Sequence, residues 1–546
     1  MLVGFGLFVA CGDPVAQDSA TSGGSTGGTG NTGDPGASES MSSTGGTSGP
    51  ATTDEPTTGA TTTMDTGEDT STTGEPAMDC YEGSIVTSVA ELSAQRLAGK
   101  NCILGDVWIF DGTGPDLWFL SEIRSIAGSF KIEGPHELVS LHGLEELESV
   151  GGPMYFGETP ELTDAGALAG LKSVGGALEL RDAPKLAALD LGALTTLGGG
   201  LRVSAGLASL DLGALTSVPG DLELEHTALT DLAGLAALTS VEGLRLSHNL
   251  ELIDLSGLSA VVQPGGRLEL EHNLKLVSLE GLGLTRVRPL ELRNNLALAS
   301  LAPLAGVTVE HGLMIVGNDA LTTLPPLQGE VGFLDVSNNG GLQNLAGLAD
   351  VVTTAEVRIS FNGALTDLQG LVGVGDALNS LTISHNPALA TLAGLAGPTS
   401  ADYVEVVGNP QLASMTALDG LQSVSSLAIA QTKAKALPNL QGLTSVDSLN
   451  IDDNPDLASL AGLENLTSVG VLRIVDNPQL TTLAPLQDGA LVEVSESYHV
   501  ADNDTLPSCL AKALYDSLQS PPESFCYDNL VDACSGLGGC VEMPMP

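Results

Sequence analysis

The chain has 546 residues, only 3% of them aromatic, and a formal net charge of −48 at pH 7. A chain this acidic repels polyanions, which excludes nucleic acid and anionic membrane surfaces as partners. The scarcity of aromatic residues, with abundant Leu, Ala and Gly, favours thin stacked coils over a bulky central core.

The chain opens with ten apolar residues, MLVGFGLFVA, at positions 1–10. They are too few to span a bilayer, which takes about 20 residues, and they fit the hydrophobic part of a signal peptide. The string Phe8-Val9-Ala10-Cys11-Gly12 resembles a bacterial lipobox. The resemblance implies that Cys11 becomes the lipidated N-terminus of an outer-membrane or surface lipoprotein of the bacterial envelope. An ordinary signal peptide with an incidental cysteine, and hence a secreted protein, is the alternative.

Residues 11–79 are dominated by Gly, Ser, Thr and Pro, with scattered acids and no Lys or Arg. Such a segment cannot bury enough apolar surface to order itself, so we expect a disordered, acidic stalk. A flexible chain of this length has a typical reach of about 45 Å. The stalk would hold a folded domain clear of a membrane surface.

The seven cysteines include no CxxC pair, and the six that remain after Cys11 lie near the two ends of the rest of the chain. This placement predicts disulfide-bonded caps in an oxidising compartment, over residues 80–106 and 506–546. A zinc site is the alternative, although the spacings do not fit common ligand patterns. The amino-terminal cap holds two of the six cysteines, and the four of the carboxy-terminal cap allow three pairings, which the sequence leaves open. In chain order the six are Cys80, Cys102, Cys509, Cys526, Cys534 and Cys540.

Residues 107–505 repeat with a period of about 22–24 residues. The clearest row is Leu244-x-Leu246-x-x-Asn249-x-x-Leu252, and two further rows follow it. Leu-x-Leu alternation predicts a short strand with one buried face, and the Asn falls where the chain leaves the strand, placed to bond backbone groups of the neighbouring coil. The predicted strand starts are Val107, Phe130, Met154, Leu178, Leu201, Leu222, Leu244, Leu268, Leu290, Leu313, Leu334, Val357, Leu381, Val404, Leu427, Leu449 and Leu472, with a degenerate one near Leu491.

These rows resemble the leucine-rich repeat, L-x-x-L-x-L-x-x-N-x-L. The segment Ser125-Ile126-Ala127-Gly128-Ser129-Phe130-Lys131-Ile132, with Leu141-His142-Gly143-Leu144, is similar to its receptor L-domain variant. The resemblance implies an α/β fold: a right-handed leucine-rich-repeat, receptor L-domain-like solenoid with one long parallel β-sheet. It also implies a disulfide between Cys80 and Cys102. Proteins of this kind are mostly recognition modules or adhesins, and few are enzymes.

The strings that mark common enzymes give no candidate site in the repeat region. Residues 80–546 hold no nucleophile elbow, no P-loop and no dinucleotide-binding glycine motif. We therefore expect that the protein is not an enzyme and that it has no catalytic residue and no cofactor.

Two columns of outward residues recur from coil to coil. In the first, Glu and Arg alternate in sign, which predicts a salt-bridge ladder across adjacent strands. In the second, His226, His248 and His272 take the same position in three consecutive coils. Stacked imidazoles could share a divalent metal or form a pH-sensitive patch, and repeat duplication that merely copies a surface residue is the alternative. The first column is Glu179, Arg202, Glu223, Arg245 and Glu269.

The coils from Leu313 to Val404 carry less polar outward residues, which mark a candidate ligand-binding face at Met314, Val316, Phe361 and Val407. The sequence thus predicts a lipid-anchored surface recognition or adhesion protein that binds a protein ligand through its strand face. A glycan is the less favoured ligand because aromatic residues are sparse. The alternative is a structural envelope spacer, or a self-associating surface protein, without a specific ligand.

Overall fold

The computed structural model describes residues 78–541, except 89, 111–113, 135–136, 262–265, 488–490, 527–528 and 530–539. The chain divides into two compact units, Met1–Gly74 and Glu75–Pro546, and every described residue belongs to the second. The predicted leader, Cys11 and nearly all of the predicted stalk therefore lie outside the described residues.

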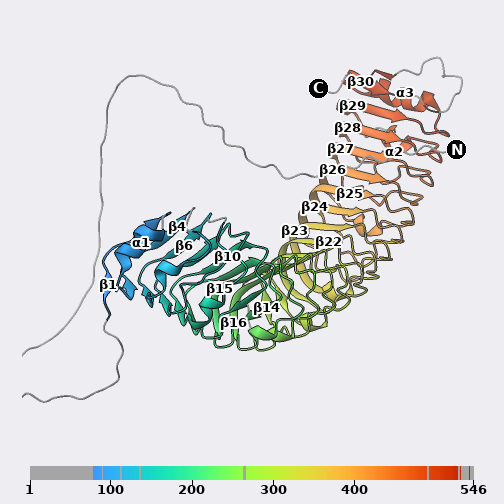
Figure 1. Ribbon diagram of the computed structural model, residues 1–546. Helices are drawn as coiled ribbons and strands as arrows, with labels where there is room; N and C mark the ends of the chain where they lie inside the picture. The colour runs from blue at the N-terminus through green and yellow to red at the C-terminus, as the bar shows by residue number, and fades with distance from the viewer. Residues whose placement is uncertain are drawn as a thin grey trace, which may run out of the picture. The chain divides into compact units, whose positions relative to one another are not determined.

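One long parallel sheet runs through the second unit, with its strands stacked coil upon coil (Figure 1). Each strand pairs with the strand of the coil before it and the coil after it, so the repeat in sequence becomes a repeat in space. In order along the sheet the strands are β2 (Ile85–Thr87), β4 (Val107–Phe110), β6 (Phe130–Glu133), β8 (Met154–Gly157), β10 (Leu178–Ala183), β13 (Leu201–Ala205), β15 (Ser217–Glu225), β16 (Ser240–Ser247), β17 (Leu268–Glu271), β19 (Leu290–Arg293), β21 (His311–Val316), β22 (Gln328–Ser337), β23 (Asp350–Ser360), β24 (Ala377–Ser384), β25 (Ser400–Val407), β26 (Ser423–Ala430), β27 (Ser445–Asp452), β28 (Ser468–Val475), β29 (Glu493–Ala501) and β30 (Ser524–Cys526).

Shorter elements complete each coil. A second parallel sheet joins β1 (Cys80–Tyr81), β3 (Cys102–Ile103), β5 (Ser125–Ile126), β7 (Ser149–Val150), β9 (Ser173–Val174) and β12 (Thr196–Leu197). Two parallel pairs are β11 (Ala188–Asp190) with β14 (Ser209–Asp211), and β18 (Arg286–Val287) with β20 (Thr308–Val309); β31 (Cys540–Val541) runs antiparallel to β30. The helices are α1 (Ala90–Leu97), α2 (Ala484–Gln487) and α3 (Ser508–Ser517), with 3₁₀ turns η1 (Trp118–Leu120), η2 (Gly166–Gly170), η3 (Ala233–Leu235), η4 (Ser256–Leu258), η5 (Ala302–Leu304), η6 (Ala346–Leu348) and η7 (Thr416–Leu418).

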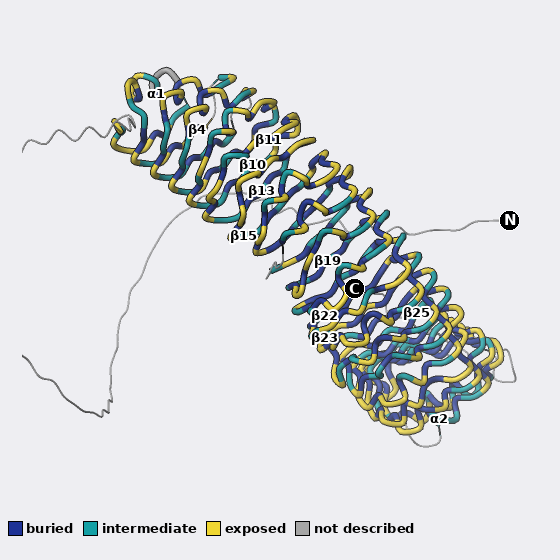
Figure 2. Tube along the Cα trace, turned by 90° about the horizontal axis from the view of Figure 1, so that it is seen from below, coloured by how far each residue is buried: buried dark blue, intermediate teal, exposed yellow. Residues whose placement is uncertain are grey.

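The predicted strand starts from Val107 to Leu472 all fall on one register line, each opposite the next. Within a row such as Leu244-Arg245-Leu246, the two leucines are buried and the residue between them is half-buried. Figure 2 shows the buried segments recurring in coil after coil. The core is thus a continuous column of aliphatic side chains, and no coil buries its apolar face without its neighbours.

A strand does begin near Leu491, with β29 at Glu493, but Leu491 is not the residue that continues the register line. The partner of Leu472 is Tyr498, whose ring is fully buried and whose hydroxyl donates to the carbonyl oxygen of Ala511 in α3 at 2.7 Å. An aromatic side chain here replaces leucine and reaches the terminal helix. The solenoid also extends further than the leucine rows, because Ile85 lies opposite Val107 and Phe525 lies opposite Tyr498.

The asparagine ladder is confirmed. At a typical rung, Asn362 donates from Nδ2 to the carbonyl oxygen of Val336 at 2.8 Å and accepts the backbone N–H of Asn339 on Oδ1 at 3.1 Å. Each rung therefore satisfies one donor and one acceptor that the solenoid buries. The ladder runs on through Asn503, which accepts the N–H of Asn477 at 2.9 Å, to Asn529, which accepts the N–H of Asn503 at 3.0 Å. Thr432 interrupts it and instead donates its hydroxyl to Asn454 at 2.8 Å.

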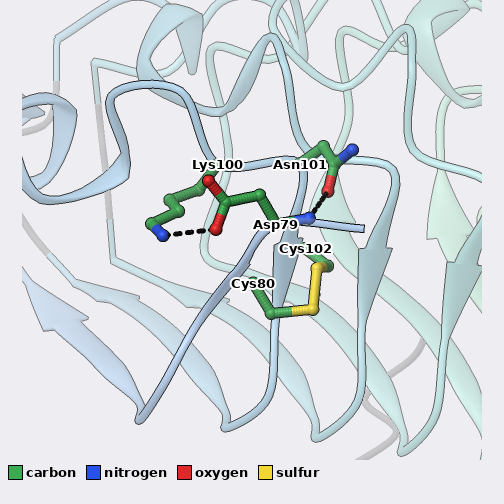
Figure 3. Close-up of a disulfide and its surroundings, with 5 residues drawn as sticks. All are labelled: Asp79, Cys80, Lys100, Asn101 and Cys102. Carbon is green, nitrogen blue, oxygen red and sulfur yellow. Dashed lines mark hydrogen bonds and ion pairs between the residues drawn. A yellow bond between two sulfur atoms is a disulfide. The ribbon is translucent and has the colours of Figure 1, made fainter. Parts of the chain in front are cut away.

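Disulfides stabilise both ends. Cys80 and Cys102 are paired, as the resemblance implies, with their Cα atoms 4.5 Å apart. Asp79 beside them accepts from Lys100 at 2.5 Å and donates its N–H to Asn101 at 2.9 Å (Figure 3). At the other end, Cys509 and Cys526 are both disulfide-bonded, and Cys526 lies opposite Cys540 in the β30–β31 pair. Cys534 lies outside the described residues, and the pairing among these four stays open.

Candidate functional site

The outward residues of the long sheet form rows that cross the strands, and we call this surface the strand face. In the predicted salt-bridge ladder, Arg202 lies 3.1 Å from Glu223, and Arg245 lies 3.3 Å from Glu269. Glu179, however, pairs with Arg181 on its own strand, at 2.5 Å. The ladder therefore forms. Its two arginines are paired with its own glutamates, so neither arginine is left to pair with a ligand.

The amino-terminal coils carry a cluster that the sequence reasoning missed. Trp108 and Phe110 on β4 are 40% and 38% exposed, with ring centroids 5.5 Å apart. The ammonium of Lys131 on β6 lies 5.3 Å from the Trp108 ring and 5.5 Å from the Tyr155 ring on β8. The guanidinium of Arg181 on β10 lies 5.8 Å from the centre of the same Tyr155 ring. We call these five residues the aromatic cluster.

Local sequence explains how the aromatic cluster is held. Trp108, Lys131 and Tyr155 are direct register partners on three adjacent strands, so their side chains are neighbours. Gly157 lets the Tyr155 ring lie along the strand, because a Cβ there would collide with the tyrosine hydroxyl. The signal was available in the sequence: three aromatic residues at outward strand positions in a chain that has few.

The predicted apolar face is not brought together. Met314 and Val316 are half-buried outward residues of β21, but Met314 lies between Glu291 and Asp335 on the adjacent strands. The row of Val316 reaches Val407 only through serines on β22, β23 and β24. Phe361 is not on the strand face, because it follows the end of β23 in a left-handed conformation with φ of 57°.

Phe361 belongs instead to a further row, the left-handed column, made of the residue just before each ladder position. These residues have positive φ, a conformation that Gly adopts freely and that Asn, Asp and His tolerate better than most. The requirement explains, without reference to a ligand, why Asn, Asp, His and Gly fill most of the column, but it does not explain Glu158, Phe361 or Gln431. From Glu158 onward its members are Glu158, Asp182, His226, His248, His272, Asn294, Gly317, Asn338, Phe361, His385, Gly408, Gln431, Asp453, Asp476 and Asp502.

The three predicted histidines stack within the left-handed column. The rings of His226 and His248 have centroids 4.8 Å apart, and those of His248 and His272 are 4.5 Å apart. Burial, with repulsion from the two flanking histidines, lowers the pKa of His248 below its usual value. In the part of the chain that the structure describes, no three His, Cys, Asp or Glu side chains are grouped to hold a metal ion. The arrangement therefore gives the metal hypothesis no support.

A strip of aliphatic side chains lies just past the ladder in two coils of the histidine stack and in the coil that follows them. Leu250, Leu274 and Leu296 each follow a ladder asparagine and are 39–48% exposed. Ile253 and Val277 extend the strip on the same coils. The strip has no aromatic ring or arginine, which are the side chains that dominate binding energy at protein interfaces.

Across the described residues, no helix is long and apolar enough to cross a membrane.

No protein-family model and no curated protein matches the chain. Among solved structures, it is similar to the Leptospira interrogans LRR protein LIC12759, at 14% identity over 74% of this chain and 91% of that one, with a TM-score of 0.30. It is also similar to the protein in a TLR13–ssRNA13 complex, at 13% identity over 80% and 89% of the two chains, with a TM-score of 0.17. At these values neither structure supplies a ligand for this chain. Its description as a leucine-rich-repeat solenoid depends on its own parallel strands and asparagine ladder.

Proposed function

We propose that this protein is a non-enzymatic recognition protein that binds another protein through the aromatic cluster on its strand face. The observation that carries the proposal is the concentration of Trp108, Phe110 and Tyr155, interleaved with Lys131 and Arg181, on four adjacent strands. Extended solenoid faces are the binding surfaces of repeat proteins, and Trp, Tyr and Arg supply most of the energy at protein interfaces.

The cluster is already ordered before any partner arrives. Lys131 is held between two rings and paired with Glu133 at 2.6 Å, and Arg181 is paired with Glu179 at 2.5 Å. A partner therefore meets rings whose conformations are fixed by neighbours, so less side-chain entropy is lost on binding.

Electrostatics also favours this region. The two cations of the cluster are matched by Glu133 and Glu179, whereas the whole chain carries a net charge of −48. A locally balanced patch on an acidic protein is the place where an interface core forms with the least repulsion and the least desolvation of unpaired charge.

The same proposal includes the anchor. Lipidation of Cys11 would fix the protein to the bacterial envelope, and the Gly-, Ser- and Thr-rich stalk would let the strand face reach about 45 Å from the membrane surface. Metabolic labelling with an alkyne fatty acid tests this part. Labelling that disappears in Cys11→Ser is expected, and equal labelling of both forms would contradict the anchor.

The binding claim is tested by capture with the purified full chain, its disulfides intact, from envelope and culture material. Trp118 provides a matched control, because it is also an exposed tryptophan, at 47%, but lies in η1 and not on the strand face. We expect one saturable protein partner that is lost with Trp108→Ala and kept with Trp118→Ala.

The alternatives give different results. Self-association alone, unchanged by Trp108→Ala, would favour the structural spacer. A partner retained by Trp108→Ala but lost with Leu274→Asp would move the interface to the aliphatic strip. Release of the captured material by free sugars, and not by protein competitors, would replace the protein ligand with a glycan.

A further inference from the structure

The left-handed column contains a second stack, and the stack is interrupted. Phe361 and His385 occupy adjacent rungs with their rings parallel within 9° and their centroids 4.6 Å apart. The next rung is Gly408, which contributes no side chain. The following rung is Gln431, whose amide donates to Asp453 at 3.1 Å. One ring position is therefore missing between His385 and Gln431.

A pocket of about 570 Å³ lies at the missing rung. Phe361 covers one face of His385, and the remaining lining residues come from the three coils that follow, so the pocket is on the side of His385 away from Phe361. Gly408 and Pro410 line it on the coil next to His385, and Lys433, Asp453 and Asp456 add charged groups from the two coils beyond.

Two sequence features shape this pocket. Glycine at position 408 lets the ring of His385 lean over the next rung, because a Cβ there would come within 2.9 Å of the Cδ2 atom of His385. The coil that follows has Thr432 where the ladder normally has Asn, and it departs from the Asn-Pro turn found at Asn409-Pro410 and Asn454-Pro455. An absent side chain and an altered turn thus meet at one point.

We infer that this pocket is a docking slot for one aromatic side chain of a protein ligand, a tryptophan or tyrosine that completes the stack on His385. The stack fixes a planar ring as the shape that fits, since a ring at the missing rung would repeat the 4.6 Å separation of Phe361 and His385. Asp453 and Asp456 favour a ring that carries an N–H or O–H donor. The inference deepens the proposed recognition role by adding a second contact point on the same solenoid.

The charge around the slot separates this occupant from a nucleobase. Two aspartates and one lysine line the slot, and the whole chain is strongly acidic, so a nucleotide phosphate would be repelled. An indole or phenol brings no negative charge. It would also bury its apolar face on His385 while its donor reaches a carboxylate.

The test uses the full disulfide-bonded chain and N-acetyl-tryptophanamide as the probe, followed by saturation-transfer NMR. We expect saturable binding with a Kd of about 1 mM. His385→Asn keeps a residue that tolerates positive φ but removes the ring, and it should weaken binding about three- to tenfold. Gly408→Asn adds a side chain whose Cβ would come within 2.9 Å of the His385 ring, so it both displaces that ring and occupies the missing rung, and it should abolish binding. The column already uses Asn at Asn294 and Asn338, so the backbone conformation tolerates the change.

His248→Asn is the matched control, because it removes a ring from the other stack and should leave the Kd unchanged. Equal binding to wild type and Gly408→Asn would overturn the slot, as would N-acetyl-leucinamide binding as tightly as the tryptophan probe. Binding of adenosine in preference to the tryptophan probe would overturn the side-chain occupant. The probe needs no natural partner, so the slot and the aromatic cluster can fail separately.

Discussion

Removing one asparagine from the middle of the ladder tests the packing logic of the whole solenoid. Asn362 is fully buried and bonds two backbone groups of other coils, the carbonyl of Val336 at 2.8 Å and the N–H of Asn339 at 3.1 Å. Asn362→Ala leaves the N–H of Asn339 without a partner in a dry interior, and it removes one of the hydrogen bonds to the Val336 carbonyl, which also belongs to the β22–β23 ladder. A buried unsatisfied group costs roughly 1–3 kcal/mol and a lost hydrogen bond about 1 kcal/mol, so we expect a loss of about 3 kcal/mol.

The loss should be local before it is global, because a solenoid's stability is approximately a sum over coils and their interfaces. Hydrogen exchange read by mass spectrometry resolves this. Peptides covering residues 334–342 and 357–365 should lose protection first, while peptides from the terminal coils should keep theirs.

Asn379→Ala provides the matched control, because Asn379 is an exposed asparagine on β24. It should change the free energy of unfolding by less than about 0.5 kcal/mol. A destabilisation below about 1 kcal/mol for Asn362→Ala, with unchanged local exchange, would refute the idea that the ladder satisfies buried backbone groups.

Two further perturbations follow from the same structure. The pKa of His248 is lower in the folded state than in the unfolded state, so its stabilising contribution is present above the usual pKa and is lost as pH falls through the folded-state value. In thermal unfolding at pH 7.5 and pH 5, His248→Asn should therefore show a smaller acid-induced drop in Tm than the wild type. An identical drop in both forms would contradict this. Replacing both Cys80 and Cys102 by Ser opens a loop with a sequence separation of 22. The change should lower the free energy of unfolding in urea by about 3 kcal/mol and should expose the α1 segment to protease. A cap as resistant to protease as that of the wild type would count against its dependence on the disulfide.

The repeat spacing was enough to predict the fold from Val107 to Leu472, including the coil in which Phe130 fills the buried strand position. It failed in the carboxy-terminal coils, where Tyr498 and Phe525 take that position without a leucine row around them. The first coil was missed for a related reason, since Ile85 lies in a strand without a leucine row.

The candidate site was predictable only in part. Identical spacing was enough to place His226, His248 and His272 in one column. It did not show that their backbone conformation is left-handed, which favours residues such as His and Asn at these positions. The same geometry moved Phe361 off the strand face. Whether outward residues form a continuous patch depends on register across several coils, which is why the serines between Val316 and Val407 were overlooked.

The most direct test of the central claim is the Kd of the captured partner for Trp108→Ala relative to Trp118→Ala, measured by biolayer interferometry on full disulfide-bonded chains. If the aromatic cluster holds the binding energy, Trp108→Ala should raise Kd at least about thirtyfold, which corresponds to a loss of about 2 kcal/mol. Trp118→Ala should stay within about threefold of the wild type. Equal Kd values for the two variants would contradict recognition through the aromatic cluster.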